Sequence, residues 1–310
     1  MIVGVYGAAG FVGTAVTLAL RSISSEVVPL AAPRVEAAWG SPPVQRQRDA
    51  DDAFAELATR MRGLEAVVNC AGLASPSAAR SPRLYGANAH LPLLLRDVCR
   101  RAGVPRFIHV SSAAVQGRRD VLDETEEHSP ASPYAAAKAA GERLLLTGSR
   151  EGLTIFRPTS VHGIDRLTTA RLAGFARSSF SSVAGPGEWA TPQVLVQNVG
   201  SAIAYTATCT GEVPVILIQP SEGHTARSVL RVLGLGREPR HLPECTARGL
   251  VSVASVGRFD HRATAWSQRL QMLWFGQPQC AGWLSAQGLS PIAGSDAWAA
   301  LAASLAKTAS

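Results

Sequence analysis

The chain has 310 residues, of which 46% are hydrophobic and 17% charged, and its formal net charge is +7. This length can bury a sizeable core, and it favours one large domain with a smaller one appended. Apolar runs stop short of the ~20 residues that a membrane helix needs, no charged segment precedes the first strand, and the five cysteines form no CxxC pair. These features exclude a membrane span, a disulfide framework and a zinc site, and they predict a cytoplasmic protein with reduced thiols and no metal.

A strand, a glycine loop and a helix follow one another at the start of the chain. Residues 2–6 are apolar, the next seven include three glycines, and helical apolar spacing comes after them. Gly7 can adopt the dihedrals of a tight turn, Gly10 leaves room for a phosphate at the helix N-terminus, and Gly13 lets the helix pack on the strand. This order predicts a dinucleotide-binding loop.

The second predicted strand, residues 27–30, ends where NAD-binding units of this kind carry an acid for the ribose hydroxyls. Here Ala31 and Arg34 follow the strand instead. With no carboxylate to repel a 2′-phosphate and a guanidinium close by, the sequence favours NADP over NAD. Glu36 lies two residues beyond Arg34, so NAD stays open.

Strands and helices continue to alternate along the first half. The predicted elements that follow are a loop (35–47), a helix (51–61), a strand (64–72), a helix (85–102) and a strand (106–112). This alternation predicts an α/β fold with a doubly wound parallel sheet. Small residues end the 64–72 strand and would let a flat ligand lie across the edge of the sheet.

The most chemically informative stretch begins where the 106–112 strand ends in Ser112. After an acidic loop, Ser132 and Pro133 provide the N-cap and first position of a helix. Tyr134 and Lys138 stand four residues apart on that helix and share one face. An ammonium beside a phenol lowers the pKa of the phenol, which makes Tyr134 a proton donor or acceptor, and Ser112 can hold the same substrate oxygen.

These motifs together resemble the extended branch of the short-chain dehydrogenase/reductase superfamily, the NAD-dependent epimerase/dehydratase-like enzymes that modify nucleotide sugars. The resemblance covers residues 1–220 and rests on GAAGFVG, NCAG, YGAN, FIHVSSAAVQG, SPYAAAK and FRPTSVHG, in that order. It implies Ser112, Tyr134 and Lys138 as the catalytic set. It also implies cofactor contacts from Gly7, Gly10, Phe11, Val12, Gly13, Arg34, Cys70, Ala71, Gly72, Asn88, Tyr134, Lys138 and Pro158.

The chain departs from this family's pattern at several positions. Gln116 replaces the tyrosine usual before Gly117, and Ser160 replaces an Asn that often contacts substrate phosphate. Ala113 and Ala114 stand where the family's sugar-nucleotide 4,6-dehydratases have an Asp-Glu pair. Without those acids we expect no elimination of water by that route.

The second half carries weaker patterns, as is common for a substrate-recognising region built from loops. The predicted elements are a helix (166–180), a strand (213–218), a helix (221–235) and a C-terminal helix (295–305) that Ser295 caps and that packs through Trp298, Leu301 and Leu305. We expect residues 1–163 with part of 190–220 to form the dinucleotide-binding domain. Residues 164–190 and 221–310 would form the substrate-binding region.

Much of the positive charge falls in the second half. Residues 224–270 hold eight arginines against three acids. Few aromatic residues lie among them and there is no Lys/Arg block, so a phosphate-bearing small molecule fits better than nucleic acid, although a solvated basic surface is the simpler alternative. A nucleoside diphosphate sugar would need fixed guanidinium partners, for which Arg227 and Arg258 are the candidates, with Ser160 as a further substrate contact.

The sequence therefore predicts an enzyme that moves a hydride between nicotinamide and a carbonyl carbon while Tyr134 passes the proton. With NADPH the expected reaction is reduction of a keto group on a nucleotide-linked sugar or a similar carbonyl compound. The alternatives are an epimerase that keeps NAD bound and, in another class, a non-catalytic dinucleotide sensor. We expect a small-molecule substrate, no nucleic-acid or membrane partner, and we leave a homodimer open.

Overall fold

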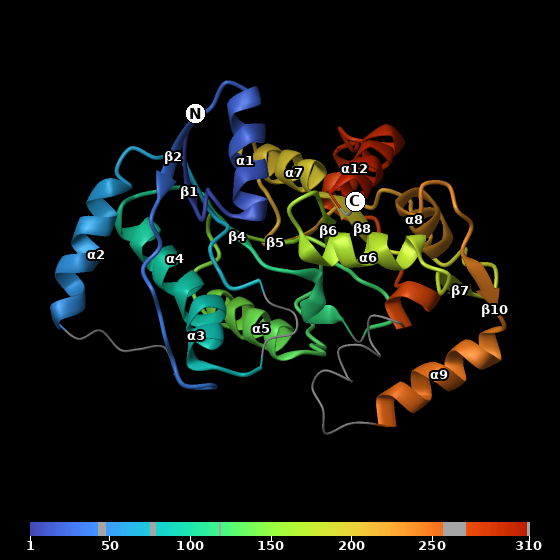
Figure 1. The fold of residues 1–310 in the computed structure, drawn as a ribbon. Coiled ribbons are helices and arrows are strands. Elements are labelled where there is room, and N and C mark those ends of the chain that lie inside the picture. The colour runs from blue at the N-terminus through green and yellow to red at the C-terminus, as the bar shows by residue number, and fades with distance from the viewer. Residues whose placement is uncertain (43–47, 75–78, 118, 257–270, 309–310) are drawn as a thin grey trace. The chain divides into compact units, whose positions relative to one another are not determined.

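A computed structural model describes residues 1–42, 48–74, 79–117, 119–256 and 271–308 (Figure 1). Two compact units divide the chain. The first consists of Met1–Gly117, Glu124–Pro158 and Val199–Gln219, and the second of Arg118–Asp123, Thr159–Asn198 and Pro220–Ser310. No described helix is long and apolar enough to cross a lipid bilayer.

A six-stranded sheet forms the centre of the first unit, and every pair of neighbouring strands in it is parallel. The strand order is β2-β1-β3-β4-β5-β9. The strands are β1 (Ile2–Tyr6), β2 (Glu26–Leu30), β3 (Ala66–Asn69), β4 (Phe107–Val110), β5 (Leu153–Arg157) and β9 (Ile216–Ile218). The order reverses direction between β1 and β3, and sheets of this kind bind ligands at the carboxyl ends of their strands at such a point. The predicted doubly wound parallel sheet is confirmed.

Helices cover both faces of this sheet (Figure 1). One face carries α1 (Phe11–Ser22) and α7 (Val196–Thr208). The two helices approach closely at Gly200, which has no side chain; a Cβ there would lie 2.6 Å from the Ala15 carbonyl oxygen. The other face carries α2 (Arg48–Arg60), α3 (Pro82–Tyr85), α4 (Leu91–Arg101) and α5 (Pro133–Leu146). Apolar side chains of α4, such as Leu95 and Val98, pack there against Phe107 and Ile155 of the strands.

The single helix predicted over residues 85–102 is wrong in one respect, because a π-helical turn, Gly86–His90, separates α3 from α4. Pro92 has no N–H to return to the carbonyl of Asn88, so the regular α-helical hydrogen bond is lost there. The Asn88 carbonyl oxygen lies against α5, where a Cβ on Gly141 would approach it to 2.3 Å. The turn therefore places Asn88 between α4 and α5.

Short strands and helices build the second unit. Its strands pair in parallel as β6 (Ser160–His162) with β8 (Gln193–Leu195) and β7 (Ser182–Ala184) with β10 (Arg240–Leu242). Its helices include α6 (Leu167–Arg177), α8 (Ala226–Leu233), α9 (Glu244–Val256), α11 (Trp283–Ala286) and α12 (Ser295–Lys307). Helices α6, α8 and α12 share one apolar core, in which Trp298 is fully buried.

Several sequence predictions for residues 213–305 need correction. The strand predicted over 213–218 is only Ile216–Ile218, and the helix predicted over 221–235 begins five residues later, where Thr225 caps Ala226–Leu233. The C-terminal helix does pack through Trp298, Leu301 and Leu305, as predicted, but Gly294 and not Ser295 occupies its N-cap. Glycine also serves at this position because it adopts the extended backbone of a cap without strain.

Candidate nucleotide and catalytic site

The glycine loop joins β1 to α1 as a tight turn. Gly7 has a φ of 71°, and the amide of Gly10 donates to its carbonyl oxygen at 2.9 Å. A Cβ on Gly7 would lie 2.9 Å from the Ala71 amide nitrogen, and one on Gly13 would lie 2.0 Å from the Gly7 carbonyl oxygen. Gly10 caps α1 without a side-chain hydrogen bond, so the helix N-terminus presents backbone N–H groups in the manner of an anion site.

The segment that follows β3 lies directly beside this loop. The Cys70 amide donates to the carbonyl of Tyr6 at 3.0 Å, and Asn69 accepts a hydrogen bond of 3.0 Å from the Ala71 amide. Burial raises the pKa of the Cys70 thiol to about 12, so the thiol stays protonated at neutral pH. Asn69 also lies 3.2 Å from Nδ1 of the buried His109, and burial holds the pKa of His109 well below its usual value. Cys70, Asn69 and His109 therefore carry no charge at neutral pH.

Asn88 and Lys138 converge on Gly72, where a Cβ would lie 2.8 Å from Asn88 Oδ1 and 3.4 Å from Lys138 Nζ. The Asn88 amide nitrogen donates to the carbonyls of Leu73 and Leu84, whereas its buried Oδ1 has no hydrogen-bond partner among the described residues. Lys138 Nζ donates to the Val110 carbonyl at 2.9 Å. An acceptor without a donor and an ammonium with further N–H groups suit a pair of ribose hydroxyls.

Burial is the main electrostatic influence on Lys138, whose side chain is only 5% exposed. It lowers the pKa of the ammonium to about 8, while Glu142 and Cys70 act in the opposite direction. At neutral pH the side chain is thus still protonated, but its charge is held in a poorly solvated place. Such perturbed groups concentrate at functional sites.

The other two members of the predicted catalytic set also lie in the first unit. The strand predicted over 106–112 is shorter, because β4 ends at Val110. Ser112 comes two residues later, and its Oγ accepts a hydrogen bond of 3.2 Å from the Ala114 amide as it caps a short 3-10 turn, Ala113–Gln116. Tyr134 stands in the first turn of α5, where Ser132 Oγ accepts from the Ala135 amide, as the sequence predicts. Its half-buried ring packs beside an apolar cluster that includes Leu84 and Tyr85. Lys138 reaches the same strand end as Ser112 through the Val110 carbonyl.

Sequence analysis did not identify a second set of polar groups, which surrounds Glu142 of α5 and which we call the Glu142 cluster (Glu142, Ser111, His128 and Arg157). The Glu142 carboxylate is fully buried and accepts hydrogen bonds from Ser111 Oγ (2.5 Å), Arg157 Nη2 (2.6 Å) and His128 Nε2 (2.8 Å). Burial alone would raise the pKa of Glu142, but the hydrogen bonds from His128 and Arg157 keep it below its usual value. A glutamate four residues after Lys138 on an alanine-rich helix was the available signal.

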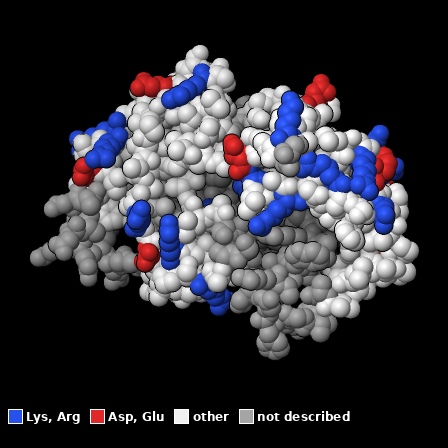
Figure 2. Space-filling model, in the orientation of Figure 1, with Lys and Arg blue, Asp and Glu red and all other residues white. Residues whose placement is uncertain are grey.

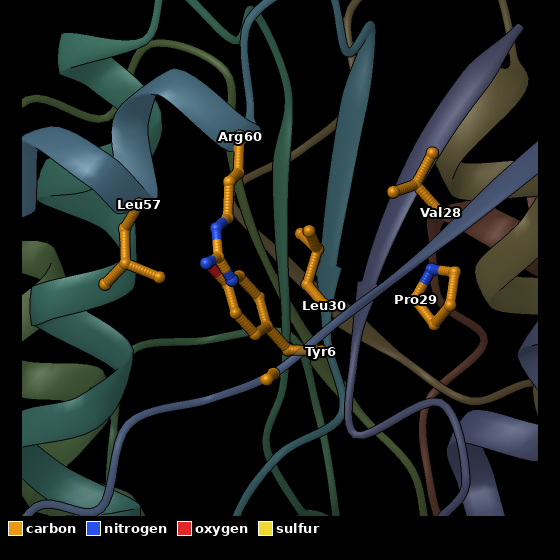
Figure 3. A pocket seen from close by; sticks show the side chains of 7 residues that line it. Tyr6, Val28, Pro29, Leu30, Leu57 and Arg60 are labelled. Atoms are coloured by element: carbon orange, nitrogen blue, oxygen red, sulfur yellow. The ribbon is translucent and has the colours of Figure 1, made fainter.

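A pocket of about 280 Å³ opens between β2 and α2 (Figure 3). Ala31 lines it together with Tyr6, Leu30 and Arg60, and its lining residues include no carboxylate. The Arg60 side chain extends from α2 toward Tyr6, and its guanidinium pairs with Glu56 at 2.5 Å. Arg34, which we predict as a cofactor contact, lies exposed beyond the end of β2.

The predicted substrate residues belong to the second unit. Ser160 begins β6, with its Oγ 3.3 Å from His162 Nε2. Arg227 on α8 is paired with Glu238 at 3.0 Å and with Glu188 at 3.6 Å, so an anionic ligand would compete with two carboxylates. Arg258 lies outside the described residues. Pro158, a predicted cofactor contact, ends the first unit's β5 segment, and its carbonyl accepts from the Ala113 amide at 2.9 Å.

Basic side chains gather over α6 and α8 on the face seen in Figure 2. Part of this charge is neutralised locally, because Glu238 pairs with both Arg227 and Arg231. These pairs are exposed and resemble a solvated basic surface more than a built anion site.

The amino-acid sequence is similar to a known family and to proteins within it. The model of the NAD-dependent epimerase/dehydratase family matches residues 3–185. A UDP-glucose 4-epimerase of Azospirillum brasilense is 32% identical over 174 residues, which cover 52% of this chain and 49% of that protein. A UDP-glucose 4-epimerase of Neisseria gonorrhoeae is 38% identical over 87 residues, 26% of each chain. The matches thus span about half or less of these relatives' lengths.

Solved structures share the fold over the whole chain. The UDP-glucose 4-epimerase of Thermus thermophilus, in complex with NAD, has a TM-score of 0.62 at 22% identity and covers 99% of both chains. The UDP-glucuronic acid 4-epimerase of Bacillus cereus, also with NAD, has a TM-score of 0.65 at 15% identity, covering 99% of this chain and 97% of its own. At this level of identity the likeness establishes the fold.

Proposed function

The chain belongs to the NAD-dependent epimerase/dehydratase family, and from this premise we propose that it is a nucleotide-sugar epimerase that retains NAD while it turns over. One observation carries the proposal. The buried ammonium of Lys138, one helical turn from Tyr134, and the unpartnered Oδ1 of Asn88 both lie within 3.4 Å of the place of a Cβ on Gly72. This arrangement can both hold a dinucleotide and move a proton.

The residues present fit such a dinucleotide. The N-terminus of α1 and the glycine loop would hold its pyrophosphate, because backbone N–H groups point out of a turn that only glycine can form. Asn88 Oδ1 and Lys138 Nζ would bind the hydroxyls of the nicotinamide ribose. When bound, the nicotinamide supplies a reversible hydride acceptor. The protein's own side chains have to accept and return the proton of the sugar hydroxyl.

Tyr134 is the group proposed to exchange that proton with the sugar hydroxyl. Its phenolate takes the proton as the hydroxyl becomes a keto group, and the phenol returns the proton when the hydroxyl re-forms on the opposite face. The positive charge of Lys138 stabilises the phenolate form. The Ser112 hydroxyl donates a hydrogen bond to the same sugar oxygen, which helps to hold the negative charge that develops there.

Ala113 and Ala114 distinguish this proposal from a dehydratase. Both follow Ser112 in the 3-10 turn, and neither can act as an acid or a base. Elimination of water from a sugar needs a group to protonate the leaving hydroxyl and another to remove a proton from carbon. The turn next to Ser112 lacks both, which favours an epimerase or a reductase.

A reductase that consumes NADPH is the second candidate, and it rests on β2. Ala31 lines the pocket at the end of that strand without a carboxylate, and Arg34 follows with an exposed guanidinium. An arginine near the ribose can pair with a 2′-phosphate. The relatives are named as epimerases and the structural neighbours bind NAD, so the comparisons favour the epimerase. The cytoplasmic location and the homodimer stay predictions.

Native mass spectrometry of the purified protein, followed by incubation with UDP-glucose, tests the proposal. We expect retained NAD, formation of the 4-epimer of the sugar, and no net consumption of added NADPH. Tyr134→Phe should keep the bound NAD and lose activity by on the order of 10²–10⁴-fold, because only the proton transfer is removed. Stoichiometric consumption of NADPH with a 4-keto nucleotide sugar as the substrate would identify a reductase instead, and unchanged function in Tyr134→Phe would favour a non-catalytic sensor.

A further inference from the structure

The Glu142 cluster joins helix α5 to the end of strand β4, which Lys138 also contacts. Two successive contacts make this junction. Lys138 Nζ donates to the carbonyl of Val110, and one helical turn later the Glu142 carboxylate accepts from the hydroxyl of Ser111. The next residue along the chain is Ser112. The position of α5 along the strand therefore decides how its first turn, with Tyr134, lies relative to Ser112.

Arg157 makes the junction rigid from a third direction. Its guanidinium is fully buried, donates to both oxygens of Glu142, and also donates from Nη1 to the Thr125 carbonyl at 2.7 Å. His128 completes the set from the loop that precedes α5. On another face of the helix, Gly141 packs so closely on the Asn88 carbonyl that a Cβ would lie 2.3 Å from that oxygen. Helix α5 is thus held on two sides and has little freedom to slide.

The carboxylate also acts through its charge. Lys138 interacts electrostatically with Glu142 on the same helix, with Cys70 after β3 and with His109 on β4. Cys70 and His109 are buried and neutral at neutral pH, so Glu142 is the anion among them. Without it, the buried Arg157 guanidinium would lose its carboxylate partner and Lys138 would lose a nearby negative charge.

We propose that Glu142 is a positioning residue for the epimerase activity put forward above: it holds α5 against β4 so that Tyr134 and Lys138 meet the sugar oxygen together with Ser112, and it keeps Lys138 charged. Glu142 touches neither sugar nor dinucleotide in this role. It acts through the helix and through the ammonium. The expected changes in kcat and in the kinetic pH profile rest on the proposed epimerase function. The expected change in the ionisation of Tyr134 does not.

Glu142→Gln in the full-length protein is the principal test, because glutamine keeps the size of the side chain and removes its charge. We expect kcat to fall by on the order of tenfold to a hundredfold with KM within about twofold, since misplacement of catalytic groups affects the reaction more than binding. We also expect the alkaline limb of the pH profile to move to lower pH, because Lys138 loses its proton more easily. Arg143→Gln, an exposed change of charge at the next position, is the matched control and should behave as wild type.

A titration that needs no substrate separates this proposal from the proposed function. The ultraviolet absorbance of tyrosinate, measured against pH in wild type and in Tyr134→Phe, isolates the ionisation of Tyr134. In Glu142→Gln that ionisation should move to higher pH. A shift of this kind in a protein that converts no sugar nucleotide would support the role of Glu142 and refute the epimerase. An unmoved Tyr134 ionisation together with an unmoved kinetic pH profile would overturn the role of Glu142.

Ser111→Ala provides a second variant in case Glu142→Gln does not fold. It removes one of the hydrogen bonds to Glu142 and leaves the ion pair with Arg157 in place. A smaller loss of kcat, with the Tyr134 ionisation shifted in the same direction, is expected. A loss of thermal stability with kcat and the Tyr134 ionisation both unchanged would reduce the Glu142 cluster to a structural feature.

Discussion

The ammonium of Lys138 is buried, and among the described residues its hydrogen-bond acceptor is the Val110 carbonyl; this burial should destabilise the folded protein at neutral pH. Its pKa falls from 10.5 to about 8 because burial disfavours the charged form. Between those two values the unfolded chain holds the proton and the folded chain does not, so folding stability rises with pH across this window. Below a pH of about 8, the folded state bears the full free-energy cost of burying the charged ammonium. A protein keeps such a residue for its function.

We therefore expect Lys138→Met to be more stable than wild type by about 1–3 kcal/mol at neutral pH while it loses the proposed activity, because an apolar side chain of similar length needs no solvation. The gain should shrink as the pH rises from about 8 through 10.5, because above 10.5 wild-type Lys138 is mostly neutral in both states. Urea unfolding at both pH values measures this.

The chain has one other lysine, Lys307, which is exposed at the end of α12 and provides the control. Lys307→Met should change stability by less than about 0.5 kcal/mol at either pH. A Lys138→Met protein that is less stable than wild type at neutral pH would show that the ammonium contributes more through its contacts than it costs through its burial.

For single residues, the sequence predicts local relations but not contacts between residues that are far apart in the chain. Spacing alone predicts that Tyr134 and Lys138 share a helix face and that Ser112 ends a strand, because these are local properties. The Glu142 cluster joins residues up to 46 positions apart, from Ser111 to Arg157, and only folding brings them together. Arg227 shows the converse case, since its sequence suggests an anion ligand whereas its guanidinium already pairs with Glu238.

Among the elements, the C-terminal helix α12 depends on a few polar contacts as well as on its apolar stripe. The Trp298 indole donates to Glu222 Oε2 at 2.7 Å, and the same carboxylate accepts from Asn198 and from the Leu195 amide. Burial raises the pKa of Glu222, but hydrogen bonds led by that of His224 hold it below its usual value. The ionised carboxylate thus stabilises the folded state above the usual pKa, and this contribution is lost as the pH falls through the lowered one.

Trp298→Phe should destabilise the protein by about 1–3 kcal/mol at neutral pH, because the buried carboxylate loses a donor that phenylalanine cannot replace. The difference from wild type should shrink in acid as Glu222 becomes protonated. Urea unfolding curves provide the measurement. Trp189→Phe, at a position that is 42% exposed, should differ from wild type by less than about 0.5 kcal/mol. Equal effects at the two tryptophans would contradict the importance of the bond to Glu222.

Elements of the first unit could be predicted because their patterns are regular: buried strands alternate with amphipathic helices, and glycine and proline mark their ends. The π-helical turn at Gly86–His90 could not be predicted from apolar spacing, which continues through it. In the second unit strands of three residues are too short for a period to be recognised, and β6, β7, β8 and β10 are all of this length.

On the scale of the whole molecule, the two compact units differ in the evidence that each provides. The first unit contains the family-matched sheet, the glycine loop and the proposed Ser112, Tyr134 and Lys138 set. The second unit contains Ser160 and Arg227, whose role in binding substrate stays a prediction. That division explains why the type of chemistry can be proposed with more support than the sugar on which it acts.

Transfer of a hydrogen label through the reaction tests the central claim most directly. The purified protein, with only the dinucleotide that it retains, is incubated with UDP-glucose carrying deuterium at C4 of the sugar, and the product is analysed by mass spectrometry and NMR. The account predicts the 4-epimer with deuterium still at C4, because the hydride leaves that carbon and returns to its other face while Tyr134 carries only the hydroxyl proton. An epimer whose deuterium had been replaced by solvent hydrogen would contradict it, and so would a protein that leaves UDP-glucose unchanged but reduces a 4-keto nucleotide sugar with added NADPH.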